Sequence, residues 1–177
     1  HGVGVSVTNA LSTRLEVEVT RDGARHRIAF SGGVVIEALQ RLGDAPKKAS
    51  GTRVRTWPDA QFFDSANIPA GELERLLRSK AVLLPGLEIT LTIENGTTTS
   101  WCFANGMQQY LAEQIEGELT APIFTAEKYA PAGDENFPLG SGAAWALCWS
   151  AEGNLARESY VNLIPTPAGG THETGLR

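Results

Sequence analysis

Two glycines near the start of the chain, Gly2 and Gly4, have the spacing of a turn that a ligand can approach closely. Neither residue carries a Cβ, so the backbone there can come near a bound group. Val7 and Leu11 follow Val3 at helical spacing, which predicts a helix directly after the turn. A glycine turn leading into a helix presents free N–H groups and the positive end of the helix dipole, which suits phosphate. An ordinary tight turn has the same pattern, so the glycines by themselves leave both interpretations open.

A second stretch, residues 51–59, alternates as a strand and ends at Pro58, which cannot donate to a ladder. Thr52 and Val54 fall on one face of this strand. A hydroxyl and an apolar side chain on one face could line a pocket, because pockets combine mostly apolar lining with a few placed polar groups. A core strand with one hydrogen-bonded threonine would have the same pattern.

A third stretch contains Gly169, Gly170 and His172 just before the end of the chain. His172 is a candidate for acid–base chemistry, although a single histidine at a helix start is more often a hydrogen-bonded structural residue. The two cysteines, Cys102 and Cys148, are too few for a disulfide framework or a metal site. They are expected to be buried, reduced thiols.

The composition fits a globular chain, with 42% hydrophobic and 20% charged residues among 177. This length corresponds to one domain or parts of two. The net charge of −5 argues against a protein that grips DNA over its whole surface. No apolar run approaches the ~20 residues that span a bilayer, and no signal peptide opens the chain. We expect a cytoplasmic protein, and a piece of a longer one because the chain starts inside a motif.

Periodicity and turn residues predict an α+β fold. Hairpin turns are expected at Asp22-Gly23 and Asn95-Gly96. The stretch 34–42 leaves helix and strand open, and 158–164 is expected to pair with the apolar strand 143–150. The further expected strands are 14–20, 25–30, 51–58, 87–93, 97–103 and 121–130, and the further expected helices are 72–84 and 107–115. The helix at 72–84 carries an apolar stripe that is expected to be buried in the core: Leu73, Leu76, Leu77, Ala81 and Leu84.

The three stretches resemble, in the same order, segments of the GHKL ATPase subunits of bacterial type II topoisomerases. His-Gly-Val-Gly-Val-Ser-Val-x-Asn-Ala-Leu-Ser, at 1–12, is similar to the segment that closes the ATP lid. Gly-Thr-x-Val-x-x-Trp-Pro, from 51, is similar to the strand that floors the nucleotide pocket. Asn-x-Ile-x-Thr-x-x-Gly-Gly-Thr-His-x-x-Gly, from 162, is similar to the transducer. The Ile-Pro-Thr and Trp-Pro-Asp-x-x-Phe-Phe-Asp stretches look more like the B subunits of topoisomerase IV than like those of gyrase.

This resemblance implies that residues 1–105 are the C-terminal part of a GHKL (Bergerat) α/β sandwich. Residues 106–177 would be the first part of a ribosomal-S5-like transducer domain, and 34–42 would be a strand. Arg21 would lie at the pocket edge where aminocoumarin-type inhibitors dock, with a solvated turn arginine as the equal alternative. The implied ATP-binding residues are the backbone of His1, Gly2, Val3, Gly4 and Val5, with the side chains of Thr52 and Val54.

The resemblance also implies ATP and Mg²⁺ as cofactors and a magnesium-dependent ATPase in the full-length protein. The general-base glutamate, the magnesium-binding asparagine and the γ-phosphate lysine of the family do not lie in this chain, so it should carry no catalytic residue and no metal. The implied partners are DNA, a second copy in an ATP-dependent dimer clamp, and the A subunit of topoisomerase IV in a heterotetramer. The location would be bacterial cytoplasm, at the nucleoid. The B subunit of gyrase, or a non-hydrolysing GHKL-type scaffold, remains the alternative.

Overall fold

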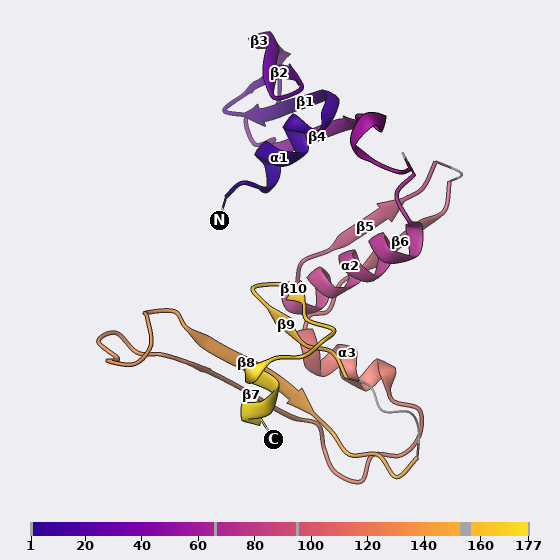
Figure 1. Ribbon diagram of the computed structural model, residues 1–177, viewed down its shortest axis with the longest axis vertical. Coiled ribbons are helices and arrows are strands. Elements are labelled where there is room, and N and C mark those ends of the chain that lie inside the picture. Colours follow the sequence, from indigo (N-terminus) through magenta and orange to yellow (C-terminus); the bar gives the residue numbers. More distant parts are fainter. Residues whose placement is uncertain (1, 66, 95, 153–156, 177) are drawn as a thin grey trace. The chain divides into compact units, whose positions relative to one another are not determined.

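The computed structural model describes residues 2–65, 67–94, 96–152 and 157–176, and the chain divides into two compact units (Figure 1). The first unit is His1–Ile68 and the second is Pro69–Arg177. The first contains α1 (Gly4–Ala10), β1 (Ser12–Arg21), β2 (Ala24–Ser31), β3 (Val34–Asp44), β4 (Gly51–Pro58) and a short 3-10 helix, η1 (Ala60–Phe62). The second contains α2 (Ala70–Leu83), β5 (Ile89–Thr92), β6 (Thr98–Trp101), α3 (Gly106–Gln114), β7 (Phe124–Tyr129), β8 (Gly142–Leu147), β9 (Tyr160–Val161), β10 (Ile164–Pro165) and α4 (Thr171–Leu176).

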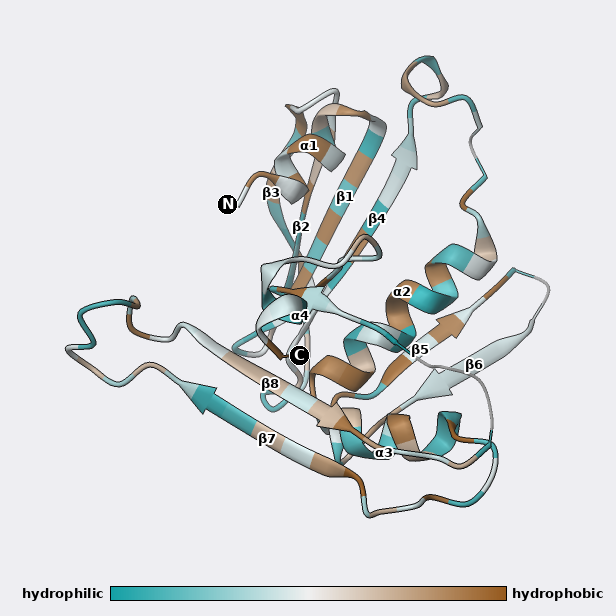
Figure 2. Ribbon diagram, turned by 60° about the horizontal axis from the view of Figure 1, so that its bottom comes forward, coloured by the Kyte–Doolittle hydropathy of each residue, from teal (hydrophilic) through white to brown (hydrophobic). Residues whose placement is uncertain are grey.

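In the first unit, β1–β4 form one antiparallel sheet in the order β3-β2-β1-β4. The four predicted strands are confirmed, including 34–42, for which the residues alone left helix and strand open. Asp22 (φ 53°) and Gly23 (φ 78°) form the predicted hairpin turn in the left-handed conformation that type I′ turns require. Hydrophobic and hydrophilic residues alternate along β1 (Figure 2). This alternation places Leu15, which is 2% exposed, on the buried face.

The other face of the sheet carries ion pairs that join β1, β2 and β3. Arg14 Nε lies 2.7 Å from Glu16 Oε1, and Arg14 Nη2 lies 2.5 Å from Glu37 Oε1. Arg27 Nη2 approaches the second oxygen of Glu37 at 3.0 Å. The hydrogen bond from Arg14 is the main cause that lowers the pKa of the Glu37 carboxyl below its ordinary value. Side chains therefore connect these strands in addition to the backbone ladder.

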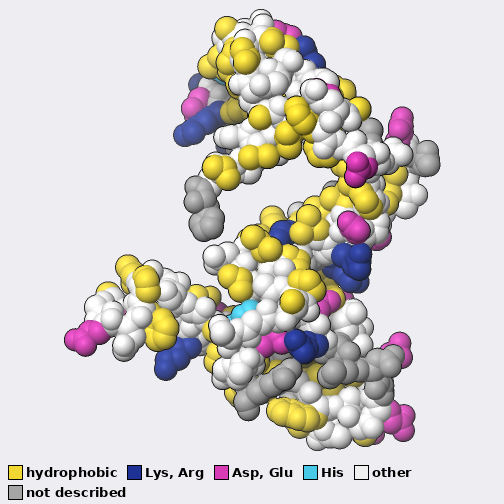
Figure 3. Space-filling view, in the orientation of Figure 1, with side chains coloured by type: hydrophobic (Ala, Val, Ile, Leu, Met, Phe, Trp, Pro, Cys, Tyr) yellow, Lys and Arg dark blue, Asp and Glu magenta, His cyan; other side chains and the backbone are white. Residues whose placement is uncertain are grey.

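Hydrophobic side chains also lie on the surface of the first unit (Figure 3). Every residue of β4 is exposed, and its Val54 side chain is 56% exposed. Exposed apolar area of this kind is typical of a surface that meets a ligand or another part of a protein. The strand that the sequence connects with nucleotide binding therefore belongs to the least covered part of the sheet.

The core of the second unit lies between α2, α3 and the β5–β6 hairpin. Ala81, Val82 and Phe103 are buried together, and Phe103 meets Tyr110 edge-on at a ring-centroid distance of 5.6 Å. Phe103 therefore packs over the last turns of α2. The predicted apolar stripe of α2 is only partly correct, because Leu76 is 42% exposed. The buried residues of α2 lie in its last turns, and they include Val82, which is not in the predicted stripe. The core includes side chains on both sides of position 105, and the predicted domain boundary there stays a prediction.

The strand pairing predicted for 158–164 is wrong. β8 pairs with β7, and residues 160–165 instead form a small hairpin of β9 and β10. The cause is local: Asn162 (φ 49°) and Leu163 (φ 69°) take the left-handed conformation, which turns the chain back after two residues. Asn95, in the predicted Asn95-Gly96 turn, lies outside the described residues.

The cysteines correct a second expectation, because Cys102 is exposed and Cys148 is half-buried, both as free thiols. Side chains alternate across an extended chain, so turning Trp101 and Phe103 inward directs Cys102 outward. Within the described part of the chain, no helix combines the length and the hydropathy needed to cross a membrane.

Candidate functional site

The opening segment leaves backbone amides free at the start of α1. Gly2 has φ 110°, a conformation that glycine adopts without strain, and nothing within 4 Å would meet a Cβ at Gly2 or Gly4. Val3 is the N-cap residue and has no side-chain acceptor, so the first amides of the helix receive no cap from it. These exposed N–H groups are those that the sequence predicts as phosphate ligands. His1, the first predicted ligand, lies outside the described residues.

The other predicted ligands, Thr52 and Val54, lie in β4 opposite Val19 and Val17 of β1. Thr56 follows on the same face because strand side chains alternate. Its hydroxyl lies 2.7 Å from the Ser12 hydroxyl, which in turn donates to the Thr8 carbonyl of α1 at 2.6 Å. Thr52 and Val54 therefore share the sheet face against which the C-terminal end of α1 packs.

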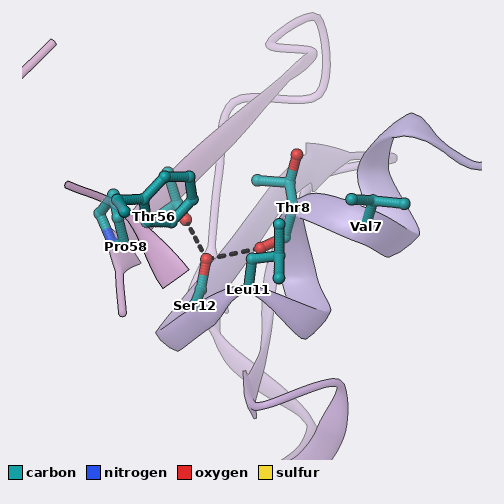
Figure 4. A pocket seen from close by; sticks show the side chains of 7 residues that line it. Val7, Thr8, Leu11, Ser12, Thr56 and Pro58 are labelled. Carbon is teal, nitrogen blue, oxygen red and sulfur yellow. Dashed lines mark hydrogen bonds between the residues drawn. The ribbon is translucent and has the colours of Figure 1, made fainter. Parts of the chain in front are cut away.

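A cavity of about 220 Å³ lies on this face (Figure 4). Its lining residues come from α1, β1, β4 and the segment after η1: Val7, Thr8, Leu11, Ser12, Thr56, Pro58 and Phe63. The hydroxyls in this wall bond to one another and to the α1 backbone, with Thr8 donating to the Gly4 carbonyl at 3.0 Å. The cavity thus presents mainly apolar surface.

The lining of this cavity differs from the set predicted from the sequence. Among the described residues, the lining includes neither Thr52 nor Val54, and none of residues 2–5. The first residue of β4 that lines the cavity is Thr56, two positions after Val54. Sequence reasoning missed Thr56 and Phe63. Thr56 could have been predicted, because strand alternation places it on the same face as Thr52 and Val54. Phe63 could not, because it reaches the cavity wall only through the turn made by η1.

Arg21 lies at the end of β1, beside the hairpin turn. Its side chain is 79% exposed, and its Nε lies 3.4 Å from a carboxylate oxygen of Asp22, whose side chain is 88% exposed. An exposed pair of this kind holds a side chain only weakly, because solvent competes for both charges. Arg21 is therefore free to meet a ligand, and its role at a pocket edge stays a prediction.

His172 takes part in a different cluster, in the second unit. Its Nε2 lies 3.0 Å from Ser159 Oγ, which also bonds to the Thr166 hydroxyl. Beside it, Arg157 Nη2 lies 2.5 Å from Glu173 Oε2. These contacts hold the start of α4 against the β9–β10 segment, which fits the structural alternative for His172 better than acid–base chemistry. Among the described residues, no three His, Cys, Asp or Glu side chains gather as a metal site would require.

The arrangement is a mixed α/β fold in which a glycine-led helix packs on an antiparallel sheet, and it matches GHKL ATPase domains. The topoisomerase IV ATP-binding domain of Francisella tularensis, solved with a small-molecule inhibitor, is 34% identical and has a TM-score of 0.70 over 99% of this chain. The 43K ATPase domain of Thermus thermophilus gyrase B, solved with an aminocoumarin, is 32% identical with a TM-score of 0.81 over 98% of this chain. Each match covers 46% of the solved chain.

Curated relatives show which B subunits this chain is similar to. The DNA topoisomerase 4 B subunit of Escherichia coli strain K12 is 48% identical over all of this chain, and that of Haemophilus influenzae strain Rd is 42% identical. A family model described as DNA gyrase B matches residues 106–177. The chain belongs to the family of DNA topoisomerase 4 B subunits. It spans 28% of the length of the Escherichia coli relative.

Proposed function

We propose that this chain is part of the ATP-binding subunit of a type II DNA topoisomerase, of the topoisomerase IV type, and contributes one part of its nucleotide pocket. The observation that carries the proposal is the pairing of two features in one unit. The uncapped start of α1 after Gly2 and Gly4 offers free amides, while Thr52 and Val54 lie on the sheet face against which α1 packs. The inhibitor-bound ATP-binding domain of the Francisella tularensis relative supports it.

In this proposal the amides of Val3, Gly4 and Val5 donate to phosphate oxygens, at the positive end of the α1 dipole. The Thr52 hydroxyl hydrogen-bonds the adenine edge, and Val54 packs on the face of the base. ATP supplies the phosphoanhydride bond whose hydrolysis drives the cycle. The family resemblance puts the Mg²⁺ ligand outside this chain, so the residues of this chain serve nucleotide binding only.

The wider cycle follows from the family. ATP binding orders the opening segment and dimerises two copies of the protein around a DNA duplex. The A subunit of topoisomerase IV, the partner, cleaves a second duplex, and the first is passed through it, so that DNA is relaxed or decatenated. This work takes place on bacterial DNA in the cytoplasm. Aminocoumarin-type compounds, such as the one bound to the Thermus thermophilus gyrase B domain, would compete for the pocket edge near Arg21.

Calorimetry with a non-hydrolysable ATP analogue on the full-length protein tests the nucleotide assignment. Thr52→Val keeps the shape of the side chain and removes its hydroxyl. We expect its affinity for the analogue to fall about tenfold, the cost of one lost hydrogen bond in a binding site. Arg53→Gln is the matched control, because Arg53 is the next residue of β4 and points to the opposite face. Equal affinities of the two variants would contradict the assignment.

A second measurement separates the topoisomerase from a non-hydrolysing scaffold and from gyrase. The full-length protein is combined with the A subunit of topoisomerase IV, and ATP turnover is followed with and without DNA. DNA-stimulated turnover together with decatenation supports the proposal. ATP-dependent negative supercoiling would assign the gyrase function instead, and binding without turnover would assign the scaffold.

A further inference from the structure

Charge is divided unequally between the two units of the chain. Residues 1–68 contain nine Lys and Arg against seven Asp and Glu, whereas residues 69–177 contain six against thirteen. The first unit is therefore slightly basic, although the whole chain has a formal net charge of −5. A local basic surface attracts a polyanion even on a protein whose overall charge is negative.

Two arginines of β4 lie on the sheet face that carries the ion pairs, here called the charged face. Arg53 and Arg55 are opposite Glu18 and Glu16 of β1, and residues that are directly opposite in a ladder point to the same side. Both arginines are exposed, as is every residue of β4. The charged face thus presents two exposed cationic residues along this strand.

The carboxylates of the charged face do not neutralise these two arginines. Glu16 is 9% exposed, and its Oε1 lies 2.7 Å from Arg14 Nε. Glu18 is half-buried and lies opposite Arg53. Among the residues that the structure describes, Arg53 and Arg55 take part in no ion pair. Arg55 therefore faces a carboxylate that another arginine already occupies.

Arg25 of β2 extends this surface towards the hairpin end of the sheet. It is exposed and lies opposite Thr20 of β1, two positions after Glu18, so it points to the charged face as well. Its Nη2 lies 3.9 Å from the position that a Cβ at Gly43 of β3 would take. The guanidinium of Arg25 therefore lies beside a glycine of β3, and within the described part of the chain it has no ion pair.

The loop before β4 brings two lysines to the same end of the sheet. Lys47 and Lys48 are both exposed. A backbone hydrogen bond of 2.9 Å to the Gly23 carbonyl holds the start of this loop beside the turn between β1 and β2. Asp22 and Asp44 also lie at this end, and each contacts an arginine outside the surface. The two lysines thus add to the positive charge of Arg25.

We propose that five residues form a contact surface for the phosphate backbone of a DNA duplex: Arg25, Lys47, Lys48, Arg53 and Arg55. Side chains on one face of a strand repeat about every 7 Å, so this surface spans about 14 Å along β4. One DNA strand carries about four phosphates over that length. Guanidinium groups suit them, because each can bond two phosphate oxygens at once.

This surface is separate from the proposed nucleotide pocket. Thr52 and Val54 alternate with Arg53 and Arg55 along β4, so they point to the opposite face of the sheet. DNA bound at the charged face therefore leaves the nucleotide face open. The inference rests on the proposed function, because it takes DNA as the polyanion, and the contact is to phosphates and reads no base sequence.

The test measures binding of the full-length protein to a DNA duplex without nucleotide, by fluorescence anisotropy at several salt concentrations. The variant combines Arg25→Gln, Arg53→Gln and Arg55→Gln. Each phosphate contact contributes about 0.9 to the slope of log K against log salt, so we expect the slope to become shallower by about 2 to 3. The matched control removes the same charge at exposed residues outside the surface, through Arg41→Gln, Arg75→Gln and Lys128→Gln. Its slope should stay close to that of the wild type.

The outcomes separate this inference from the proposed function. Equal slopes in the variant and the control would overturn the DNA surface. An unchanged DNA slope with weaker binding of the A subunit of topoisomerase IV would also overturn it, and would assign the surface to a protein partner. Affinity for an ATP analogue should be unchanged in the variant. If the wild-type protein binds no ATP analogue, the proposed function fails, and the slopes still decide whether this surface meets DNA.

Discussion

The two units of the chain differ in what surrounds their glycines. In the first unit, the nearest atom that an added Cβ would meet lies 3.7 Å away, at Gly23 and Gly33. In the second unit, Gly106 would meet Pro85 at 2.9 Å, and Gly142 would meet Tyr129 at 2.2 Å. Among the described residues of the first unit, no glycine permits a close approach of this kind, whereas Gly106 and Gly142 of the second unit bring backbone and side chains together.

The stabilising contacts differ in the same way. The first unit relies on a four-stranded ladder, a few buried side chains such as Leu15, and ion pairs around Glu37. Much of its apolar surface is exposed, β4 included. The second unit relies on close packing between helices and on hydrogen bonds that converge on Glu158. The proposed binding surface thus belongs to the unit that is built around a single sheet.

Removing the largest fully buried side chain of the first unit should have the largest effect. We expect Leu15→Ala to lower the free energy of unfolding of the sheet by about 3 kcal/mol, through lost burial and a residual cavity. Hydrogen exchange at β1 and β2 measures it, with exchange at α2 and α3 staying as in the wild type. Val34→Ala is the control, because Val34 is 68% exposed. An equal loss of protection in both units would show that they are not separately stabilised.

Gly106→Ala makes the corresponding change in the second unit. Its φ of 50° and the nearby Pro85 and Val82 atoms leave no room for a methyl group. We expect a loss of about 2 kcal/mol, from overpacking and strain, read as faster exchange at α2 and α3. Gly71→Ala, near the start of α2 with open space around it, should be neutral or slightly stabilising. Comparable losses at the two positions would contradict the difference in packing.

Acid should weaken the first unit. The pKa of Glu37 is lowered in the folded state, so the folded protein binds fewer protons than the unfolded one in this range. Its contribution is present above the ordinary value of 4.5 and is lost as the pH falls through the folded value. Thermal unfolding measured across this pH range should show stability falling as the pH is lowered, and Glu37→Gln should reduce this pH dependence. An unchanged slope in that variant would mean that the ion pairs contribute little.

Alkali should weaken the second unit. The raised pKa of Tyr110 means that stability is complete below the ordinary value of 10.0 and is lost as the pH rises towards about 12. A phenolate absorbance titration checks the value. Tyr110→Phe should reduce the alkaline slope and leave the part that Tyr160 contributes, whereas Tyr129→Phe, at a side chain that is 57% exposed, should keep the whole slope. The opposite result would place the alkaline transition outside the Glu158 network.

Local pattern was a good guide wherever neighbours in sequence decide the structure. The Asp22-Gly23 turn and the strands beside it follow from alternation and turn chemistry, and the structure confirms them. The pairing predicted for 158–164 failed because Leu163 takes a left-handed conformation that its residue type disfavours. A contact from Lys80, 83 positions away in sequence, accompanies that turn and carries no local signature.

The candidate site likewise contains residues that could be predicted from the sequence and residues that could not. The motif residues Gly2, Gly4, Thr52 and Val54 could be chosen from the family resemblance of the stretches that contain them. The cavity beside them could not, since Phe63 joins its wall only after η1 turns the chain. Sequence by itself determined the strands at 14–20, 25–30 and 51–58, the Asp22-Gly23 turn and the family, because these follow from local alternation, turn chemistry and motif residues. Only the tertiary structure decided which side chains meet around Glu158 and His172, because those contacts join segments 13 to 48 positions apart.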